Sequence, residues 1–363
     1  MMFSSPITQF GSGTLMVMAG GTGGHVYPAM AVADYMQDHG WKIVWLCTEG
    51  GMENRLIEGK SYHKAMITMR GVRGKGLLGW LLLPIKLATA LQQSFVAIRL
   101  HKPNVVLGMG GFAAFPGGLM AKIMRKPLVI HEQNSIAGLT NKTLSLIANK
   151  VLAAFPSAFV NNAELVGNPV RAEITQLAAP EQRYSQRTGK LNLLVVGGSL
   201  GAQALNDVLP KALAGLPNNH FNIVHQAGEK HIAALQANYH AASRAADLKA
   251  FINNMAEQYA WADIVICRAG ALTIAELACV GVASVLVPFP HAVDDHQTYN
   301  AKYLSDAGAA QLIQQAEFNV EKASEILQGL TRQMCLNMAI KAKQLAKPEA
   351  TASVAKVCME AAR

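Results

Sequence analysis

Short apolar runs alternate with helix-like patterns along most of the chain. The runs are four to six residues long and rich in β-branched side chains. This alternation predicts βαβ units on parallel sheets. The expected strands are residues 15–18, 43–47, 105–108, 128–131 and 151–154 in the first half, and 191–196, 221–225, 264–267 and 284–287 in the second half.

Each half begins with a strand that runs into a glycine-rich turn with one hydroxyl residue and then a helix. The two segments are 15–24, LMVMAGGTGG, and 193–202, LLVVGGSLGA. A second pair of buried strands, 104–111 and 263–270, also ends in glycine turns. The repetition predicts an α/β fold class with two Rossmann-like, doubly wound domains. Such sheets bind ligands beyond the carboxyl ends of their strands, so we expect two facing domains to share a central cleft lined by all four turns.

The domain boundary is expected near residues 167–171, because Asn168-Pro169 is a turn motif. The first domain then covers residues 1–170 and the second begins at residue 171. Residues 1–13 have neither a basic segment nor a long apolar segment, so they do not predict a secretory signal. The five cysteines are scattered without a CxxC pair, which is typical of free thiols in a reducing compartment.

Composition indicates a folded protein with an anionic partner. Hydrophobic residues make up 51% of the 363 residues and charged residues 15%, which excludes a disordered chain. The net charge of +9 is local: residues 59–131 hold eleven Lys and Arg and no Asp or Glu, whereas the other 21 Lys and Arg are balanced by 23 acidic residues.

This basic stretch contains the apolar run 77–85 with Trp80. Nine residues cannot cross a bilayer, which takes ~20, but basic residues around a short apolar run suit an anionic membrane surface. A core helix with a solvated basic face is the alternative. Nucleic acid is disfavoured, because the stretch lacks the interleaved aromatic residues of a stacking platform.

The glycine turns predict an anion site, because backbone N–H groups and a helix N-terminus together attract phosphate. Neither turn matches the dinucleotide fingerprint, which disfavours a nicotinamide or flavin enzyme, and no Walker A sequence is present. The chain also lacks the Asp-x-Asp pair that holds a divalent cation on a sugar diphosphate. If a nucleotide diphosphate binds, protein groups must neutralise it.

Three further segments carry candidate chemistry. His25 begins the helix after the first turn, where the helix dipole favours a neutral imidazole that can act as a general base, although a lone histidine can also be structural. Residues 131–134, HEQN, end a strand in the same half and either reach the cleft or cap the next helix.

In the second half, residues 268–276 run from a strand end into a helix. Glu276 there can bind a ribose diol or complement the helix dipole. A separate polar group is interpreted as a loop before a helix rather than as a metal site; it consists of His291, Asp294, Asp295 and His296.

Taken together, these motifs resemble the MurG family of glycosyltransferases, in order and over nearly the whole chain. The matching segments are 20–28, 108–112, 131–134, 167–171, 197–199, 268–273 and 296–297. The resemblance implies a GT-B fold and an inverting, metal-independent transfer without a cofactor. The reaction would move N-acetylglucosamine from UDP-N-acetylglucosamine to the C4 hydroxyl of undecaprenyl-diphospho-MurNAc-pentapeptide, converting lipid I to lipid II in peptidoglycan synthesis.

The resemblance also implies the domain roles and the location. Residues 1–170 would form the acceptor and membrane-binding domain, with the final helix 349–363 packing back on it. Residues 171–348 would bind UDP-N-acetylglucosamine. The protein would be peripheral, on the cytoplasmic face of the bacterial inner membrane.

Carried over residue by residue, the family's sugar-donor site falls on Thr22, Gly23, Gly24, Asn134, Arg171, Ser199, Ile252, Ala271, Leu272, Thr273, Ile274, Ala275, Glu276 and Gln297. Ser199 and Arg171 would hold the diphosphate, Glu276 the ribose, Asn134 and Gln297 the sugar hydroxyls, and the backbone of Ile252 the uracil. The expected base is His25, with Glu132 as the rival.

Two positions depart from the family pattern. Phe112 stands where some members have tyrosine, and Leu200 stands in the phosphate turn where a polar residue is common. Three alternatives stay open: a UDP-N-acetylglucosamine 2-epimerase of the same fold, a non-catalytic nucleotide-binding protein that docks on membranes, and, least favoured, a nicotinamide oxidoreductase.

Overall fold

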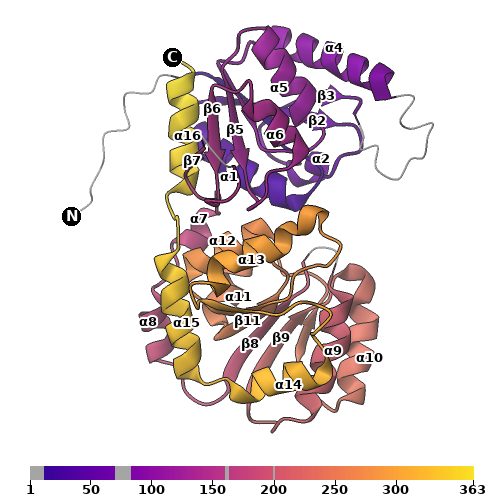
Figure 1. Ribbon diagram of the computed structural model, residues 1–363, viewed down its shortest axis with the longest axis vertical. Coiled ribbons are helices and arrows are strands. Elements are labelled where there is room, and N and C mark those ends of the chain that lie inside the picture. Colours follow the sequence, from indigo (N-terminus) through magenta and orange to yellow (C-terminus); the bar gives the residue numbers. More distant parts are fainter. Residues whose placement is uncertain (1–11, 70–82, 160–162, 199–200) are drawn as a thin grey trace. The chain divides into compact units, whose positions relative to one another are not determined.

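The computed structural model describes residues 12–69, 83–159, 163–198 and 201–363. The chain divides into two compact units. The amino-terminal unit consists of Met1–Val170 together with Glu349–Arg363, and the carboxyl-terminal unit is Arg171–Pro348. Each unit is built on one parallel sheet covered by helices (Figure 1).

The sheet of the amino-terminal unit has the order β3-β2-β1-β4-β5-β6-β7, and all its strand pairs are parallel. Neighbouring residues of β1 point to opposite faces, so Leu15 and Val17 join one core and Met16 and Met18 the other. The strands are β1 (Thr14–Met18), β2 (Lys42–Thr48), β3 (His63–Ile67), β4 (Val105–Gly108), β5 (Leu128–Glu132), β6 (Lys150–Ala153) and β7 (Glu164–Leu165).

Helices cover both faces of this sheet. Helices α1 and α16 pack together on one face, and α4, α5 and α6 on the other (Figure 1). The last helix of the chain thus completes the core of the first unit. The helices are α1 (Gly23–Asp38), α2 (Met52–Leu56), α4 (Leu83–His101), α5 (Ala114–Ile123), α6 (Leu139–Ser145) and α16 (Ala350–Ala361).

The sheet of the carboxyl-terminal unit has the order β10-β9-β8-β11-β12-β13, again with all pairs parallel. Its central strands are buried apolar runs, as expected for a sheet covered on both faces. The strands are β8 (Leu191–Val196), β9 (Phe221–Gln226), β10 (Asp247–Lys249), β11 (Ile264–Cys267), β12 (Ala283–Leu286) and β13 (Ala310–Leu312).

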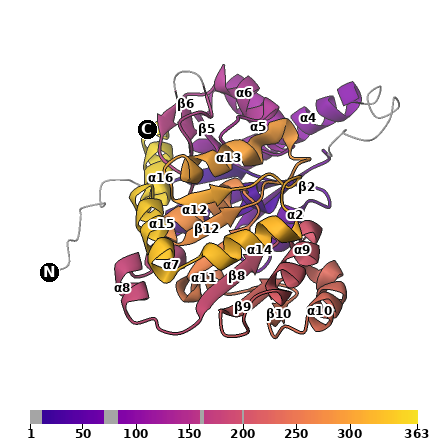
Figure 2. The same cartoon turned by 60° about the horizontal axis from the view of Figure 1, so that its bottom comes forward.

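In this unit α15 runs beside α12, and α9 lies between α10 and α14 (Figures 1 and 2). The helices are α7 (Ala172–Thr175), α8 (Pro180–Ser185), α9 (Gln203–Ala214), α10 (Ile232–Ala241), α11 (Met255–Trp261), α12 (Ala271–Val280), α13 (His296–Ser305), α14 (Val320–Gly329) and α15 (Arg332–Gln344), with two 3₁₀ turns, Glu229–His231 and Val293–Asp295.

The predicted fold class is confirmed, because both units are doubly wound parallel sheets. In each sheet the strand order reverses beside the first strand of the unit, between β1 and β4 and between β8 and β11. Doubly wound folds bind ligands at the carboxyl ends of such strands. The four glycine turns follow these four strands.

Most of the apolar run 77–85 lies outside the described residues; its last three residues, 83–85, begin α4. In the described part of the chain, no helix has the length and apolar character needed to cross a membrane. All five cysteines are buried free thiols.

Candidate functional site

The glycine turns after β1 and β4 touch each other. Gly111 has a φ of 88°, and a Cβ atom on it would lie 2.4 Å from the carbonyl oxygen of Gly20. Only glycine permits this approach at a positive φ. The contact therefore brings two candidate motifs together where the strand order reverses.

His25 lies in the first turn of α1, and its ring packs against the second glycine turn. Its Nδ1 atom is 3.1 Å from the carbonyl oxygen of Gly20 and 3.4 Å from Oγ1 of Thr22. A Cβ on Gly110 would lie 3.1 Å from Nε2. A carbonyl oxygen only accepts hydrogen bonds, so the contact with Gly20 assigns the proton of the neutral ring to Nδ1. The lone pair is then on Nε2, which can accept a proton.

His131, at the end of β5, is fully buried and held in one neutral form. Its Nε2 donates to the carbonyl of Gly167 at 2.9 Å, and its Nδ1 accepts from the amide of Gln133 at 3.0 Å. Burial lowers the pKa of His131 to about 4. These contacts tie β5 to the Gly167 turn, so His131 has a structural role near neutral pH.

Glu132 is also buried, and its carboxylate organises the loop after β5. Oε1 accepts from the backbone N–H of Asn134 at 3.0 Å and from its side chain at 3.2 Å. Oε2 accepts from the N–H of Gly138 at 3.1 Å and from the amide of Asn141 at 2.8 Å. A carboxylate has about four acceptor sites, and these four donors occupy them. Asn134 is held beside Glu132 by the same bonds.

The glycine turn after β8 is a tight backbone loop at the start of α9. A Cβ on Gly197 would lie 2.6 Å from the N atom of Ala202, and one on Gly201 would lie 2.3 Å from the carbonyl oxygen of Ala227. Gly198 and Gly201 both have positive φ values. Ser199 and Leu200 lie outside the described residues. At Gly197 and Gly201 the backbone leaves no room for a side chain, and at Gly198 the positive φ favours glycine, which suits a loop whose N–H groups approach a phosphate.

Arg171 and Glu276 form an ion pair in the carboxyl-terminal unit. Nη2 of Arg171 lies 3.3 Å from Oε1 of Glu276, and the hydroxyl of Tyr259 donates to Oε2 at 3.1 Å. Burial raises the pKa of Glu276, while the charge of Arg171 and the bond from Tyr259 oppose that shift. Two of about four acceptor sites of this carboxylate are used by these contacts. Glu276 thus differs from Glu132, whose acceptor sites are full.

The rest of the candidate sugar-donor set surrounds α12. Gly270 is the N-cap of α12 and offers no side chain, so the first N–H groups of the helix, from Ala271 to Thr273, are available to an anion. The Oε1 atom of Gln297 accepts from the N–H groups of Ala269 and Phe289 at 3.2 and 3.0 Å, which orients its amide. Ile252 is buried just before α11.

Three sets of predicted residues are therefore in contact: Thr22 with His25, Glu132 with Asn134, and Arg171 with Glu276. The two candidate bases, His25 and Glu132, lie in the amino-terminal unit. Of the sugar-donor set, Thr22, Gly23, Gly24 and Asn134 also belong to that unit, and the remaining members belong to the carboxyl-terminal unit. In the loop before α13, Asp295 accepts from Thr298 at 2.7 Å. Among the described residues no three His, Cys, Asp or Glu side chains are grouped to hold a metal ion.

Sequence reasoning missed Tyr259. It follows Glu257 and Gln258 in α11, and nothing in the local sequence marks a tyrosine whose hydroxyl meets a carboxylate 17 positions later. Its partner, Glu276, can be identified only once the packing of α11 on α12 is known.

Both halves of the chain match known protein families. Residues 15–153 match the glycosyltransferase family 28 N-terminal domain, and residues 192–356 match the family 28 C-terminal domain. Together the two matches cover most of the chain.

Individual proteins are similar over nearly their whole length. Chains from Nitrosospira multiformis and Cupriavidus metallidurans are 53% and 56% identical, each over 96% of this chain and over 99% and 98% of their own. Both are named UDP-N-acetylglucosamine--N-acetylmuramyl-(pentapeptide) pyrophosphoryl-undecaprenol N-acetylglucosamine transferase.

Solved structures agree with this similarity. The crystal structure of Acinetobacter baumannii MurG is 42% identical, covers 96% of this chain and 99% of its own, and has a TM-score of 0.85. A UDP-GlcNAc 2-epimerase from Neisseria meningitidis is 14% identical over 97% of this chain and 99% of its own, with a TM-score of 0.62, and shares the fold alone. The chain therefore belongs to glycosyltransferase family 28 and, within it, to the MurG transferases.

Proposed function

We propose that the protein transfers N-acetylglucosamine from UDP-N-acetylglucosamine to the C4 hydroxyl of undecaprenyl-diphospho-MurNAc-pentapeptide. The observation that carries this proposal is the similarity, over nearly the full length, to transferases named for these two substrates. The 2-epimerase alternative is supported only by the fold, at 14% identity.

The reaction is a direct displacement at C1 of the donor sugar. The C4 hydroxyl of the acceptor attacks from the face opposite UDP, the bond from C1 to the diphosphate oxygen breaks, and the new linkage is β. A base must take the hydroxyl proton, and the negative charge that builds on the leaving diphosphate must be stabilised.

His25 is the base in this proposal. Its hydrogen bond to Gly20 leaves Nε2 as the acceptor, and its ring lies against the glycine turn that follows β4. Glu132 is less suited to this role. Its four hydrogen-bond donors would have to be displaced before either oxygen could take a proton.

The carboxyl-terminal unit holds the sugar nucleotide in this proposal. The N–H groups of the turn 197–202 and of the start of α12 bind the diphosphate together with Arg171, and Ser199 adds its hydroxyl. Glu276 accepts from the ribose diol with its two remaining acceptor sites. Gln297 and Asn134 bind the sugar hydroxyls, Ile252 offers backbone groups to the uracil, and Thr22 and the N–H groups of Gly23 and Gly24 complete the sugar-donor site.

The amino-terminal unit binds the acceptor and the cytoplasmic face of the membrane in this proposal. One side of α4 packs on the sheet through Ala90, Ser94, Ala97 and Ile98. The opposite side exposes Ile85, Val96 and Leu100 together with Arg99, and we call these four residues the α4 surface. The helix has no acidic residue. Exposed aliphatic groups beside cationic ones suit the interface of a bilayer that contains anionic lipids.

The test is a transfer assay with labelled UDP-N-acetylglucosamine and a lipid I analogue. The proposal predicts one disaccharide product and one UDP for each donor consumed, and no turnover without the acceptor. Conversion of the sugar nucleotide without acceptor would instead indicate an epimerase. No UDP release with both substrates present would indicate a binding protein without catalysis.

A further inference from the structure

The contact between Tyr259 and Glu276 is buried. Tyr259 is 1% exposed and Glu276 is 6% exposed. A carboxylate only accepts hydrogen bonds, so the tyrosine hydroxyl is the donor at 3.1 Å. Arg171 holds the other carboxylate oxygen at 3.3 Å. Each oxygen of Glu276 therefore has one fixed partner and one remaining acceptor site.

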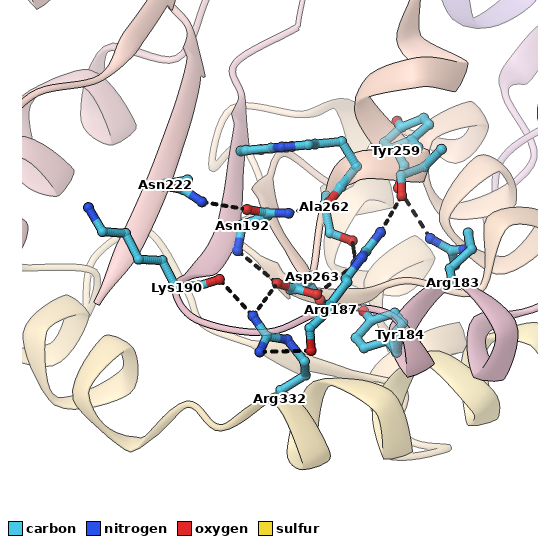
Figure 3. A network of polar contacts seen from close by, with 12 residues as sticks. Arg183, Tyr184, Arg187, Lys190, Asn192, Asn222, Tyr259, Ala262, Asp263 and Arg332 are labelled. Atoms are coloured by element: carbon cyan, nitrogen blue, oxygen red, sulfur yellow. Dashed lines mark hydrogen bonds and ion pairs between the residues drawn. The ribbon is translucent and has the colours of Figure 1, made fainter. Parts of the chain in front are cut away.

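The two helices that carry this pair are held together by Arg183 of α8. Its Nη1 donates to the carbonyl oxygen of Tyr259 on α11 at 3.3 Å (Figure 3). Its Nη2 donates to the carbonyl oxygens of Val280 at 3.0 Å and of Gly281, at the end of α12. One guanidinium thus binds the C-terminal ends of both helices, where unpaired carbonyls and the helix dipole favour a cation.

A second arginine also binds the C-terminal end of α11. Arg187 donates to the carbonyl oxygens of Ala260 and Ala262 at the end of α11, and it forms an ion pair with the buried Asp263 at 2.6 Å (Figure 3). The main chain of α11 is therefore anchored independently of Glu276. Because its backbone is fixed, the tyrosine side chain can impose an orientation on the glutamate.

We propose that Tyr259 is a positioning residue that holds Glu276 in the orientation in which both carboxylate oxygens face the ribose of the sugar nucleotide. This inference rests on the proposed function, in which Glu276 contacts the ribose. Without the hydroxyl, Oε2 keeps no fixed donor in a buried site, and the carboxylate is free to turn toward Arg171. The ribose then meets one well-placed oxygen instead of two.

The first test uses Tyr259→Phe, which keeps the ring and removes only the hydroxyl. The expected result is a rise of about 5- to 10-fold in KM for UDP-N-acetylglucosamine with kcat nearly unchanged, the size of one ordinary hydrogen bond lost to the ribose. The preference for this donor over its 2′-deoxyribose analogue should fall by a similar factor. The same kcat/KM preference in Tyr259→Phe as in the wild type would overturn the inference.

Tyr184→Phe is the matched control. Tyr184 is 3% exposed and donates from its hydroxyl to the carbonyl of Asp263 at 2.6 Å, at the opposite end of β11 from the glycine turn. This variant loses a buried tyrosine hydroxyl of the same unit and should keep the ribose preference. An equal loss of preference in both variants would indicate a general structural effect and would contradict the positioning role.

A double-mutant cycle with Glu276→Gln separates this inference from the proposed function. If Tyr259 acts through Glu276, the double variant should discriminate the ribose no worse than Glu276→Gln alone. Additive losses would overturn the positioning role while leaving the ribose contact intact. A Glu276→Gln variant that keeps full ribose preference would overturn the proposed sugar-donor site itself.

The pH dependence of kcat/KM for the donor also tests the inference, because a purely structural role of Tyr259 would leave it unchanged. The hydrogen bond from Tyr259 lowers the pKa of Glu276, so its removal raises that pKa. The ionised carboxylate binds the diol, and the acidic limb of kcat/KM for the donor should therefore move to higher pH in Tyr259→Phe. An acidic limb at the wild-type pH would count against the inference.

Discussion

The Nδ1 atom of His25, in the first turn of α1, lies 3.1 Å from the carbonyl oxygen of Gly20, in the glycine turn that precedes this helix. The contact fixes both the tautomer and the direction of the ring. Nε2 lies near Gly110, at the carboxyl end of the neighbouring strand. A proton acceptor is thus held between two turns whose backbones are themselves in contact.

Replacing His25 by alanine should lower kcat by roughly 10²- to 10⁴-fold, the usual contribution of a general base. The affinity for UDP should stay nearly unchanged, because the proposed nucleotide site lies in the other unit. Steady-state kinetics together with calorimetric titration of UDP measure both quantities. His39→Ala is the control, since His39 caps the far end of the same helix through the carbonyl of Tyr35 at 2.7 Å. A wild-type kcat in His25→Ala would contradict the assignment of His25 as the general base.

Gly111→Ala should disrupt the contact between the two turns of the amino-terminal unit. The new Cβ would lie 2.4 Å from a backbone oxygen at a φ of 88°, so the turn has to move. We expect a loss of more than about 1 kcal/mol in unfolding free energy and a lower kcat. In Gly329→Ala, the matched control, a Cβ meets no atom within 4 Å. Equal urea midpoints for the two variants would show that the close approach is not required.

Stability should fall in mild acid because each unit buries a neutral histidine. Burial lowers the pKa of His131 to about 4 and that of His225 to about 3, from an ordinary value near 6.5. The unfolded chain therefore binds more protons below about pH 6.5, and the unfolding free energy decreases as pH falls through this window.

For His131 the loss should reach about 2 kcal/mol at about pH 5, relative to neutral pH. Urea unfolding at both pH values measures it. In His131→Gln the same change of pH should lower the midpoint less, since glutamine does not titrate. A wild-type midpoint that is the same at both pH values would contradict the burial of neutral histidines.

The α4 surface should bind anionic membranes. Leu100→Ser removes a side chain that is 72% exposed. We expect roughly 10- to 100-fold weaker binding to vesicles of phosphatidylglycerol, because about 1.5 to 3 kcal/mol of apolar burial is lost. Binding of the wild type should weaken as salt rises. Met334→Ser, an exposed position of the other unit, is the control for co-sedimentation. Unchanged vesicle binding by Leu100→Ser would exclude α4 as the docking surface.

The central strands of both sheets could be predicted from the sequence, and the edge strands could not. The predicted run 105–108 coincides with β4, and 191–196 coincides with β8. The four strands that the pattern missed are β3, β7, β10 and β13, which are the edges of the two sheets. An edge strand such as β10, with the sequence DLK, pairs on one side only and has no continuous apolar run to mark it.

The site shows the same division between local and distant contacts. Glycine turns and helix starts are local, so the positions of His25 and of the anion-binding turns follow from short segments. The difference between Glu132 and Glu276 is not local. It depends on how the loop after β5 folds to bring the donors of Asn134, Gly138 and Asn141 onto Glu132. For Glu276 it depends on the packing that brings Arg171 and Tyr259 to the carboxylate.

The most direct test of the account is a crystal structure of the full chain with UDP-N-acetylglucosamine. The account predicts the uracil beside the backbone of Ile252, the ribose hydroxyls bonded to both oxygens of Glu276, and the diphosphate at the turn 197–202 with Arg171. A uridine bound at the glycine turns of the amino-terminal unit, with Glu276 still paired only to Arg171 and Tyr259, would contradict it.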